Sequence, residues 1–316
     1  MAESILSAEY FHNEEAAYEF VEGKLWPAGE QVCPHCGAVC QHYKLKGKST
    51  RPGVYKCKDC RKPFTVKVGT IFESSHIPLR LWLQAIYLIA SSKKGISANQ
   101  LHRTLGITLK SAWFMGHRIR EAMRELNPDI MGGSGSTAEM DETFVGGKEK
   151  NKHASKRDGS KRGGSGKEAV FSLVERGGKV RSHHVPVVNS DTLAPILKAQ
   201  IAADTFVVTD DNRTSRRTAK VAGFKTDSVN HSIGEYVRGE VHTNTIEGYF
   251  SILKRGITGT YHHVSAEHLK RYLGEFDFRY NERKALGVDD KQRAELLLKG
   301  VVGKRLTYAT PARGSA

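Results

Sequence analysis

The spacing of hydrophobic residues in the second half of the chain predicts strands followed by long helices. "EAVFSLVERGGKVRSHHVPV" contains two β-rich runs on either side of Gly177-Gly178, which predicts a hairpin. "TFVVTD" predicts a short buried strand that ends in an acid. "SDTLAPILKAQI" predicts a helix, with Ser190 or Asp191 as its N-cap.

Two longer helices are predicted over residues 244–256 and 265–283, because apolar residues recur there at helical spacing. Those residues are Ile246, Tyr249, Phe250 and Leu253, then Leu269, Tyr272, Leu273 and Phe276. Residues 148–167 are basic and low in complexity, and we expect them to form a mobile loop between the first two strands.

The first half of the chain reads differently, with helices predicted over residues 77–127. "GISANQLHRTLGITLKSAWFMGHRIREAM" has the layout of a helix-turn-helix, in which Gly106 ends the first helix and Thr108 caps the second. The alternative is an ordinary helical core, and we assign Trp113 and Ile119 to packing. The side chains predicted to reach phosphates or base edges are Lys110, Ser111, His117, Arg118 and Arg120.

The Pro/Gly/Ser-rich stretch "NPDIMGGSGST", residues 127–137, marks the principal domain boundary. Composition and pattern together predict an α+β protein of five parts. They are an N-terminal helical segment (1–30), a cysteine-rich segment (31–70), a helical DNA-binding segment (77–127), a strand-and-helix domain (138–285) and a C-terminal tail (286–316).

The net charge of the chain indicates which kind of partner it binds. The 316 residues carry a formal charge of +15, with a pI near 9.6, which favours a polyanion over a surface that is basic only for solubility. No apolar run approaches the roughly 18 residues of a membrane span. The N-terminus is acidic and lacks the pattern of a signal peptide. We therefore expect a cytoplasmic protein without a membrane partner.

All five cysteines lie between Cys33 and Cys60, which argues for a metal site rather than a disulfide framework. "CPHC" and "CKDC" are two C-x2-C pairs separated by 20 residues, the spacing of a tetrahedral zinc site. The predicted ligands are Cys33, Cys36, Cys57 and Cys60, holding one structural zinc ion.

Two alternatives accompany this site. Cys40 is left over and reads as a bystander, although it could replace Cys36 in another shell. Iron would bind the same four sulfurs as in a rubredoxin-like electron carrier, but that function needs no basic surface. Gly37 follows the first pair, where the turn of a knuckle often requires a positive φ.

Several acidic residues lie at or near predicted strands and helices of the strand-and-helix domain. Asp141 and Glu142 lie near the middle of the strand-like "AEMDETFVGG", Asp210 and Asp211 end "FVVTDD", and Glu247 lies on the helix after residue 243. An acid on a central strand, one at the end of another and one on a later helix can converge to hold two Mg²⁺ ions. Such a pair clamps the attacking and leaving oxygens of a phosphodiester.

The chain resembles bacterial insertion-sequence transposases of the ISXO-type group, which join a zinc ribbon to an RNase H-like DDE catalytic domain. The stretches that carry the resemblance are "MDETFVGG", "VVTDDN", "VNHSIGEYVRGEVHTNTIEGYFSILKRGITGTYHHVS" and "LKRYLGEFDFRYNER". Together with the cysteine pairs, the resemblance covers the ribbon and nearly all of residues 138–283.

The resemblance implies that Asp141, Asp210 and Glu247 are the catalytic acids. Asp211 remains an alternative to Asp210, and Asn244, one helical turn before Glu247, is a second candidate ligand. Lys254 matches a basic residue that contacts the terminal DNA in such enzymes and would lie about 10 Å from Glu247 along a straight helix.

The implied function is that of a DNA transposase working with two Mg²⁺ or Mn²⁺ ions. It would bind terminal inverted repeats, cleave the ends and join them to target DNA, as a homodimer or higher oligomer near the bacterial nucleoid. A non-catalytic DNA-binding regulator derived from a transposase, and a metal-dependent nuclease without strand transfer, are the alternatives.

Overall fold

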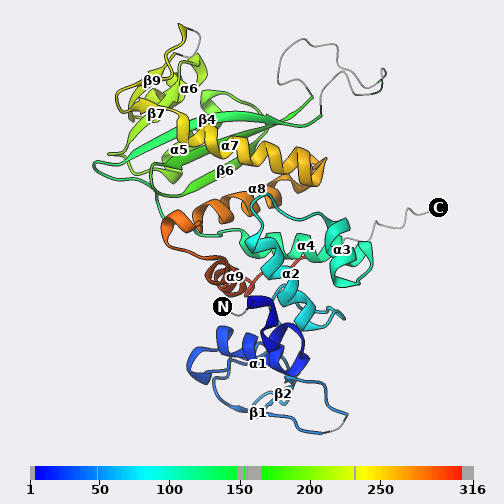
Figure 1. Cartoon of the computed structure of the whole chain (residues 1–316). Helices are drawn as coiled ribbons and strands as arrows, with labels where there is room; N and C mark the ends of the chain where they lie inside the picture. Colours follow the sequence, from blue (N-terminus) through cyan, green and yellow to red (C-terminus); the bar gives the residue numbers. More distant parts are fainter. Residues whose placement is uncertain are drawn as a thin grey trace, which may run out of the picture. The chain divides into compact units, whose positions relative to one another are not determined.

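The computed structural model describes residues 4–47, 49–147, 153, 155, 166–230 and 233–307. The chain divides into two compact units (Figure 1). The first comprises Met1–Ser92, Ile96–Arg124 and Asp289–Ala316, and the second comprises Lys93–Gly95 and Glu125–Val288. The expected loop 148–167 falls almost entirely outside the described residues.

The first unit begins with short 3₁₀ turns, η1 (Ile5–Ser7) and η2 (Glu9–Phe11), followed by α1 (Glu14–Leu25) and η3 (Pro27–Gly29). Asn13 caps α1, because its side chain accepts hydrogen bonds from the backbone of Glu15 and Ala16. A small antiparallel sheet follows, in the order β1 (His42–Lys44), β2 (Tyr55–Cys57) and β3 (Pro63–Phe64).

Helix α2 (Leu79–Ser91) is followed by two helices that match the expected helix-turn-helix layout, α3 (Ala98–Leu105) and α4 (Leu109–Met123). Gly106 adopts the left-handed conformation that ends α3, and the Thr108 hydroxyl caps α4 at Ser111. Residues 286–316, expected as a tail, contain a further helix, α9 (Asp290–Lys299), that packs against α2. Leu297 and Leu298 anchor this helix in the core, which a local reading of a short polar helix does not reveal.

The second unit is built on a five-stranded sheet in the order β6-β5-β4-β7-β8. Its strands are β4 (Thr137–Val145), β5 (Glu168–Glu175), β6 (Val180–Val185), β7 (Phe206–Asp210) and β8 (Lys225–Val229). β4, β5 and β6 form an antiparallel meander, whereas β7 and β8 run parallel to β4. The sheet thus consists of three antiparallel strands, with two parallel strands added beside the first of them. This arrangement, in an α+β chain, agrees with the expected RNase H-like fold.

Helices cover both faces of this sheet. On one face α5 (Ser190–Gln200) and α6 (Arg213–Val221) share a core with Ala138, Met140 and Phe171. On the other, α7 (Asn244–Gly256) and α8 (Ala266–Asn281) share a core with Val170 and Val174 (Figure 1). All eight apolar residues predicted to define α7 and α8 are buried in that second core.

The remaining elements are short. A two-stranded ribbon, β9 (Val237–Arg238) and β10 (Val241–His242), precedes α7. A π-helical turn, η7 (Ile257–Tyr261), follows α7, and η8 (Lys284–Leu286) follows α8. Asn189 caps α5, one residue before the expected Ser190, because its side chain accepts the backbone N–H of Thr192.

Candidate functional site

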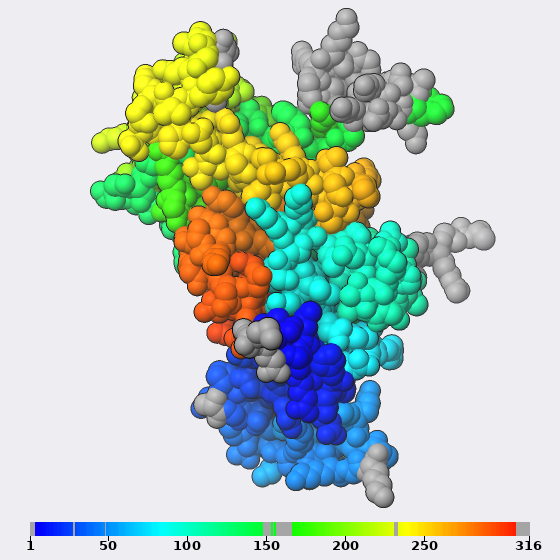
Figure 2. Space-filling model, in the orientation of Figure 1, coloured from blue at the N-terminus to red at the C-terminus, as the bar shows by residue number. Residues whose placement is uncertain are grey.

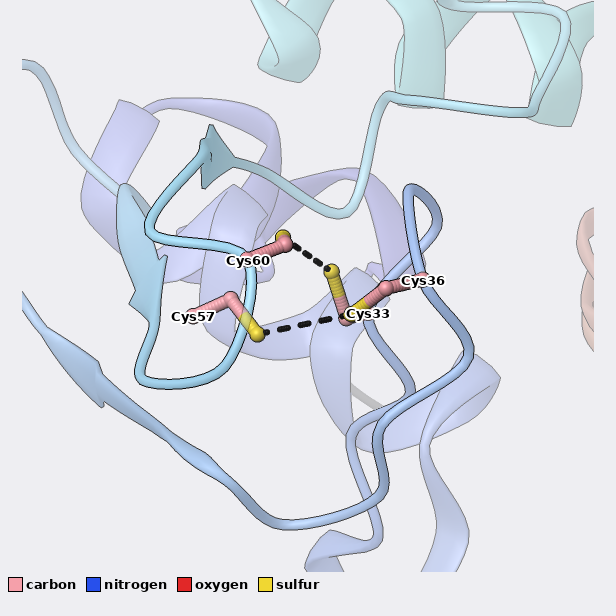
Figure 3. Close-up of side chains that lie close together, drawn as sticks. All are labelled: Cys33, Cys36, Cys57 and Cys60. Carbon is pink, nitrogen blue, oxygen red and sulfur yellow. Dashed lines mark hydrogen bonds between the residues drawn. The ribbon is translucent and has the colours of Figure 1, made fainter.

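Four cysteine sulfurs converge between the two knuckles of the small sheet (Figure 3). The Sγ–Sγ distance is 3.7 Å both for Cys33–Cys60 and for Cys36–Cys57. A tetrahedral zinc ion with bonds of about 2.3 Å places its sulfurs roughly 3.7 Å apart. Across the described ranges, no other group of three or more His, Cys, Asp or Glu side chains brings all its ligand atoms within 4.8 Å of one another. The cluster is therefore a structural zinc site.

The knuckles are built by backbone conformation as well as by spacing. Gly37 has a φ of +77°, as expected, and Arg61 adopts +57° at the equivalent position after the second pair. Burial raises the pKa of Cys33, but hydrogen bonds from the backbone of His35 and Cys36 and from the side chains of Cys36 and Cys60 together outweigh it and lower the pKa to about 7. Cys40 is exposed and lies outside the cluster, which selects Cys36 as the ligand.

The first two candidate acids lie on neighbouring strands at one level of the large sheet. β4 and β7 pair in parallel as far as Glu139 and Val208, and Asp141 and Asp210 each lie two residues beyond that pair. Since side chains alternate along a strand, Asp141 and Asp210 project from the same face as Glu139. Glu139 contacts α7, so this is the face that α7 covers.

Negative charge is concentrated around Asp141. Burial, followed by repulsion from Asp210, Glu142 and Glu247, raises its pKa to about 8. One stabilising contact is local: its Oδ1 accepts the backbone N–H of Glu142 at 2.7 Å. The acids do not reach the 4.8 Å spacing of a closed single-ion cage.

The third acid, Glu247, is exposed in the first turn of α7 and accepts a 3.1 Å hydrogen bond from the Thr243 hydroxyl. Asn244, the first residue of α7, is also exposed, as is Lys254 two turns beyond Glu247. The surface of α7, yellow to orange in Figure 2, thus presents an acid, an amide and a cation on one helix.

The neighbouring acids have other partners. Glu142 projects to the opposite face, where its carboxylate accepts hydrogen bonds from Asn212 (2.9 Å) and Ser215 (3.1 Å) at the start of α6. Asp211 forms an ion pair with Arg216 at 2.9 Å. These contacts favour Asp210 over Asp211 as the acid on β7.

Sequence reasoning missed Glu139, which is fully buried beside the candidate acids. Its carboxylate accepts hydrogen bonds from Arg176 (2.7 Å), the Thr245 hydroxyl (2.8 Å) and the backbone N–H of Ile246 (2.9 Å). Thr243, the N-cap of α7, makes no side-chain cap, so Glu139 supplies this cap from β4. The sequence did contain one indication of this role: Glu139 lies two residues before Asp141, and residues two apart on a strand share one face of the sheet.

The structure removes three residues from the expected DNA-contacting set. His117, on α4, is only 1% exposed. Arg118 is buried and donates hydrogen bonds to the backbone carbonyls of Ile71, Glu73 and Leu306. Arg120 is 4% exposed, so its guanidinium is not presented to DNA. All three lie in the buried second half of α4, where helical periodicity alone could not distinguish a solvent-exposed face from a packed one.

The first turn of α4 differs from that enclosed half. Lys110 is exposed there, and Trp113, which the sequence predicts to be a packing residue, is 37% exposed. Ile119 is buried as expected. The N-terminal residues of a recognition helix are those that enter a groove, so Lys110 remains in the expected DNA-contacting set.

Comparison with known protein families shows to which family the chain belongs. Residues 133–281 match the family described as ISXO2-like transposase domain, and residues 12–63 match the transposase zinc-ribbon domain. A protein of Halobacterium salinarum described as "Uncharacterized protein in transposable element ISH50" is 30% identical over 235 residues, covering 71% of this chain and 77% of the relative. The chain belongs to the ISXO2-like transposase family.

A second relative of this transposase-family chain is shorter. An "Uncharacterized transposase-like protein" of Haemophilus influenzae is 31% identical over 103 residues, which are 33% of this chain and 81% of that protein. A chain of the crystal structure of a pre-cleavage Mos1 transpososome matches at 10% identity with a TM-score of 0.17, covering 65% of this chain and 77% of the other. That similarity is too low to carry an argument.

The two regions that match transposase families contain both sets of candidate site residues. The zinc-ribbon match includes both cysteine pairs, and the transposase-domain match includes Asp141, Asp210 and Glu247. No described helix of this transposase-family chain is long and apolar enough to cross a bilayer.

Proposed function

We propose that this chain is a metal-dependent DNA transposase that binds the terminal inverted repeats of its element, cleaves the DNA ends and joins them to target DNA. The observation that carries the proposal is the concentration of acids around Asp141 in a chain with a net charge of +15. Mutual repulsion among neighbouring carboxylates is relieved when divalent cations bind them.

Asp141, Asp210 and Glu247 would hold two Mg²⁺ or Mn²⁺ ions, with Asn244 as a further ligand. Ions held there would supply activation of the attacking oxygen and neutralisation of the leaving one. The carboxylates would present oxygen ligands from β4, β7 and α7, and the exposure of Glu247 on α7 would let a phosphodiester approach from solvent.

The basic side chains would position the DNA. Lys254 lies on α7 about 10 Å beyond Glu247, which is within reach of a neighbouring phosphate. Lys110, in the first turn of α4, would contact the terminal repeat. Joining two ends of one element requires two active sites, so at least a homodimer would act. Its substrate, chromosomal DNA, would place the protein in the cytoplasm at the nucleoid.

Cleavage of a short terminal duplex tests this proposal. With Mg²⁺ or Mn²⁺ we expect the unmodified protein to cut the end, whereas Asp141→Ala and Asp210→Ala lose cutting by at least a hundredfold. Asp211→Ala is the matched control, because that carboxylate pairs with Arg216, and it should retain cutting. Equal cutting by all four proteins would refute the assigned site. Joined target strands would separate a transposase from a nuclease that only nicks.

A further inference from the structure

Helix α6 carries a band of positive charge that the proposed reaction does not use. In "RTSRRTAKV" four of nine side chains are basic and none is acidic. Arg213, Arg216, Arg217 and Lys220 are all exposed, whereas Ser215, Thr218 and Ala219 are buried. At about 100° of rotation per residue, the four cations fall within an arc of about 100° opposite the buried residues. We call these four residues the α6 band.

The four cations of the α6 band do not stabilise the helix that carries them. Like charges four residues apart, as in Arg213–Arg217 and Arg216–Lys220, repel each other. A cation in the first turn also opposes the helix dipole, and Arg213 is the first residue of α6. Arg216 forms a 2.9 Å ion pair with Asp211, whereas the other three cations form no ion pair with any residue that the structure describes. The arrangement is therefore unfavourable for the isolated helix and suits a polyanion bound to it.

The α6 band begins next to the candidate acids. Asn212 caps α6 through Thr214 at 2.9 Å, and its own backbone N–H donates to Asp210 at 3.2 Å. The nine residues of α6 extend about 13 Å from that point. Lys225, the first residue of β8, is exposed and follows α6 after a short turn. A track of cations thus leads away from the acidic end of β7.

We propose, on the basis of the proposed transposase function, that Arg213, Arg217 and Lys220 bind the phosphates of the target duplex. The exposed polar side chains of α6 are all cationic. Contacts to phosphates fix the position of a duplex without reading its sequence. This surface therefore suits the DNA partner that is bound independently of sequence, in contrast to the terminal repeat.

Salt-dependent binding of an unrelated 30-base-pair duplex to the full chain tests this proposal. The test variant is Arg213→Ala/Arg217→Ala/Lys220→Ala, which keeps a strong helix former at each position. The control is Lys284→Ala/Lys291→Ala/Lys299→Ala, which makes the same change in net charge at three exposed lysines elsewhere. Each lost phosphate contact should reduce the slope of log K against log salt by about 0.9, so the test variant should lose about 2 to 3.

The same variants separate target binding from end binding. We expect the test variant to join ends to target at least tenfold less efficiently while cutting a terminal duplex within twofold of the unmodified rate. A salt slope equal to that of the control overturns the proposal, as does an equal loss of affinity for the unrelated and terminal duplexes. If the unmodified chain binds duplex but never cuts it, the proposed reaction fails while the slope comparison still decides the role of α6.

Discussion

The backbone N–H of Ile246 donates a 2.9 Å hydrogen bond to Oε2 of Glu139, joining the first turn of α7 to the central strand β4. Glu139 also receives Nε of Arg176 at 2.7 Å, and Arg176 donates to the carbonyls of Glu240 and His242. Glu247 is the next residue after Ile246, and Asp141 lies two residues after Glu139. One buried carboxylate thus ties together the elements that carry two of the candidate acids.

Glu139→Leu should lower the free energy of unfolding by about 3 kcal/mol, because it leaves Nε of Arg176 and the first turn of α7 without their carboxylate acceptor. Chemical denaturation measures this change. Glu240→Gln is the matched control, since its carboxylate lies 3.9 Å from the same arginine but is 98% exposed. We expect no measurable change for the control. Equal stability of both variants would show that the buried pair contributes nothing.

Cys57→Ser should abolish zinc binding, because three thiolates and a hydroxyl do not complete the tetrahedral shell. Cys40→Ser should retain about one zinc ion per chain, since Cys40 lies outside the cluster. Metal analysis of the purified proteins, with limited proteolysis of the ribbon, distinguishes them. Loss of zinc from the Cys40 variant would move that residue into the ligand set.

Asp141→Asn should stabilise the protein when divalent metal is absent. Because the pKa of about 8 in the folded state lies above the ordinary value of 3.8, the folded state binds a proton more tightly, and that stability is lost as the pH rises from about 4 to about 8. Removing the charge should therefore raise the free energy of unfolding at pH 8 by roughly 1–3 kcal/mol.

Thermal melts at pH 8 in a chelator measure this effect, with Asp211→Asn as the control for a partly exposed, ion-paired acid. A variant that loses activity but gains stability is expected where charges are held together for function. A destabilised Asp141→Asn protein would contradict the repulsion described around this residue.

His183 should make the protein sensitive to mild acid. Burial, followed by the charge of Arg181, lowers its pKa from 6.5 to about 4. The unfolded chain then binds the proton first, so stability is present above pH 6.5 and is lost as the pH falls towards 4, by up to about 3 kcal/mol.

His183→Phe replaces the imidazole by an apolar ring and should flatten the stability profile between pH 4 and 6.5. Chemical denaturation at several pH values measures this. His184→Phe is a neighbouring control on β6, where the ring pairs with Glu168 at 2.7 Å instead of lying beside Arg181. An unchanged slope in the His183 variant would contradict burial as the cause.

Local patterns were sufficient for the elements and the zinc site. Helical spacing predicted α7 and α8 through residues such as Ile246 and Phe276, because burial of one helix face imposes a 3.6-residue period on the chain itself. The four zinc ligands were recognisable because each knuckle draws both sulfurs from one tight turn. The net charge likewise predicted a polyanionic partner, because net charge follows from the sequence whatever fold the chain adopts.

Tertiary structure alone decided which polar side chains face solvent. Arg118 looks on a helical wheel like a DNA contact, but carbonyls of Ile71 and Leu306, distant in sequence, enclose it. Glu139 reads as an ordinary surface acid until β4 becomes a central strand with helices on both faces. Periodicity reports that a side chain has neighbours, whereas which elements supply them depends on how the whole chain packs.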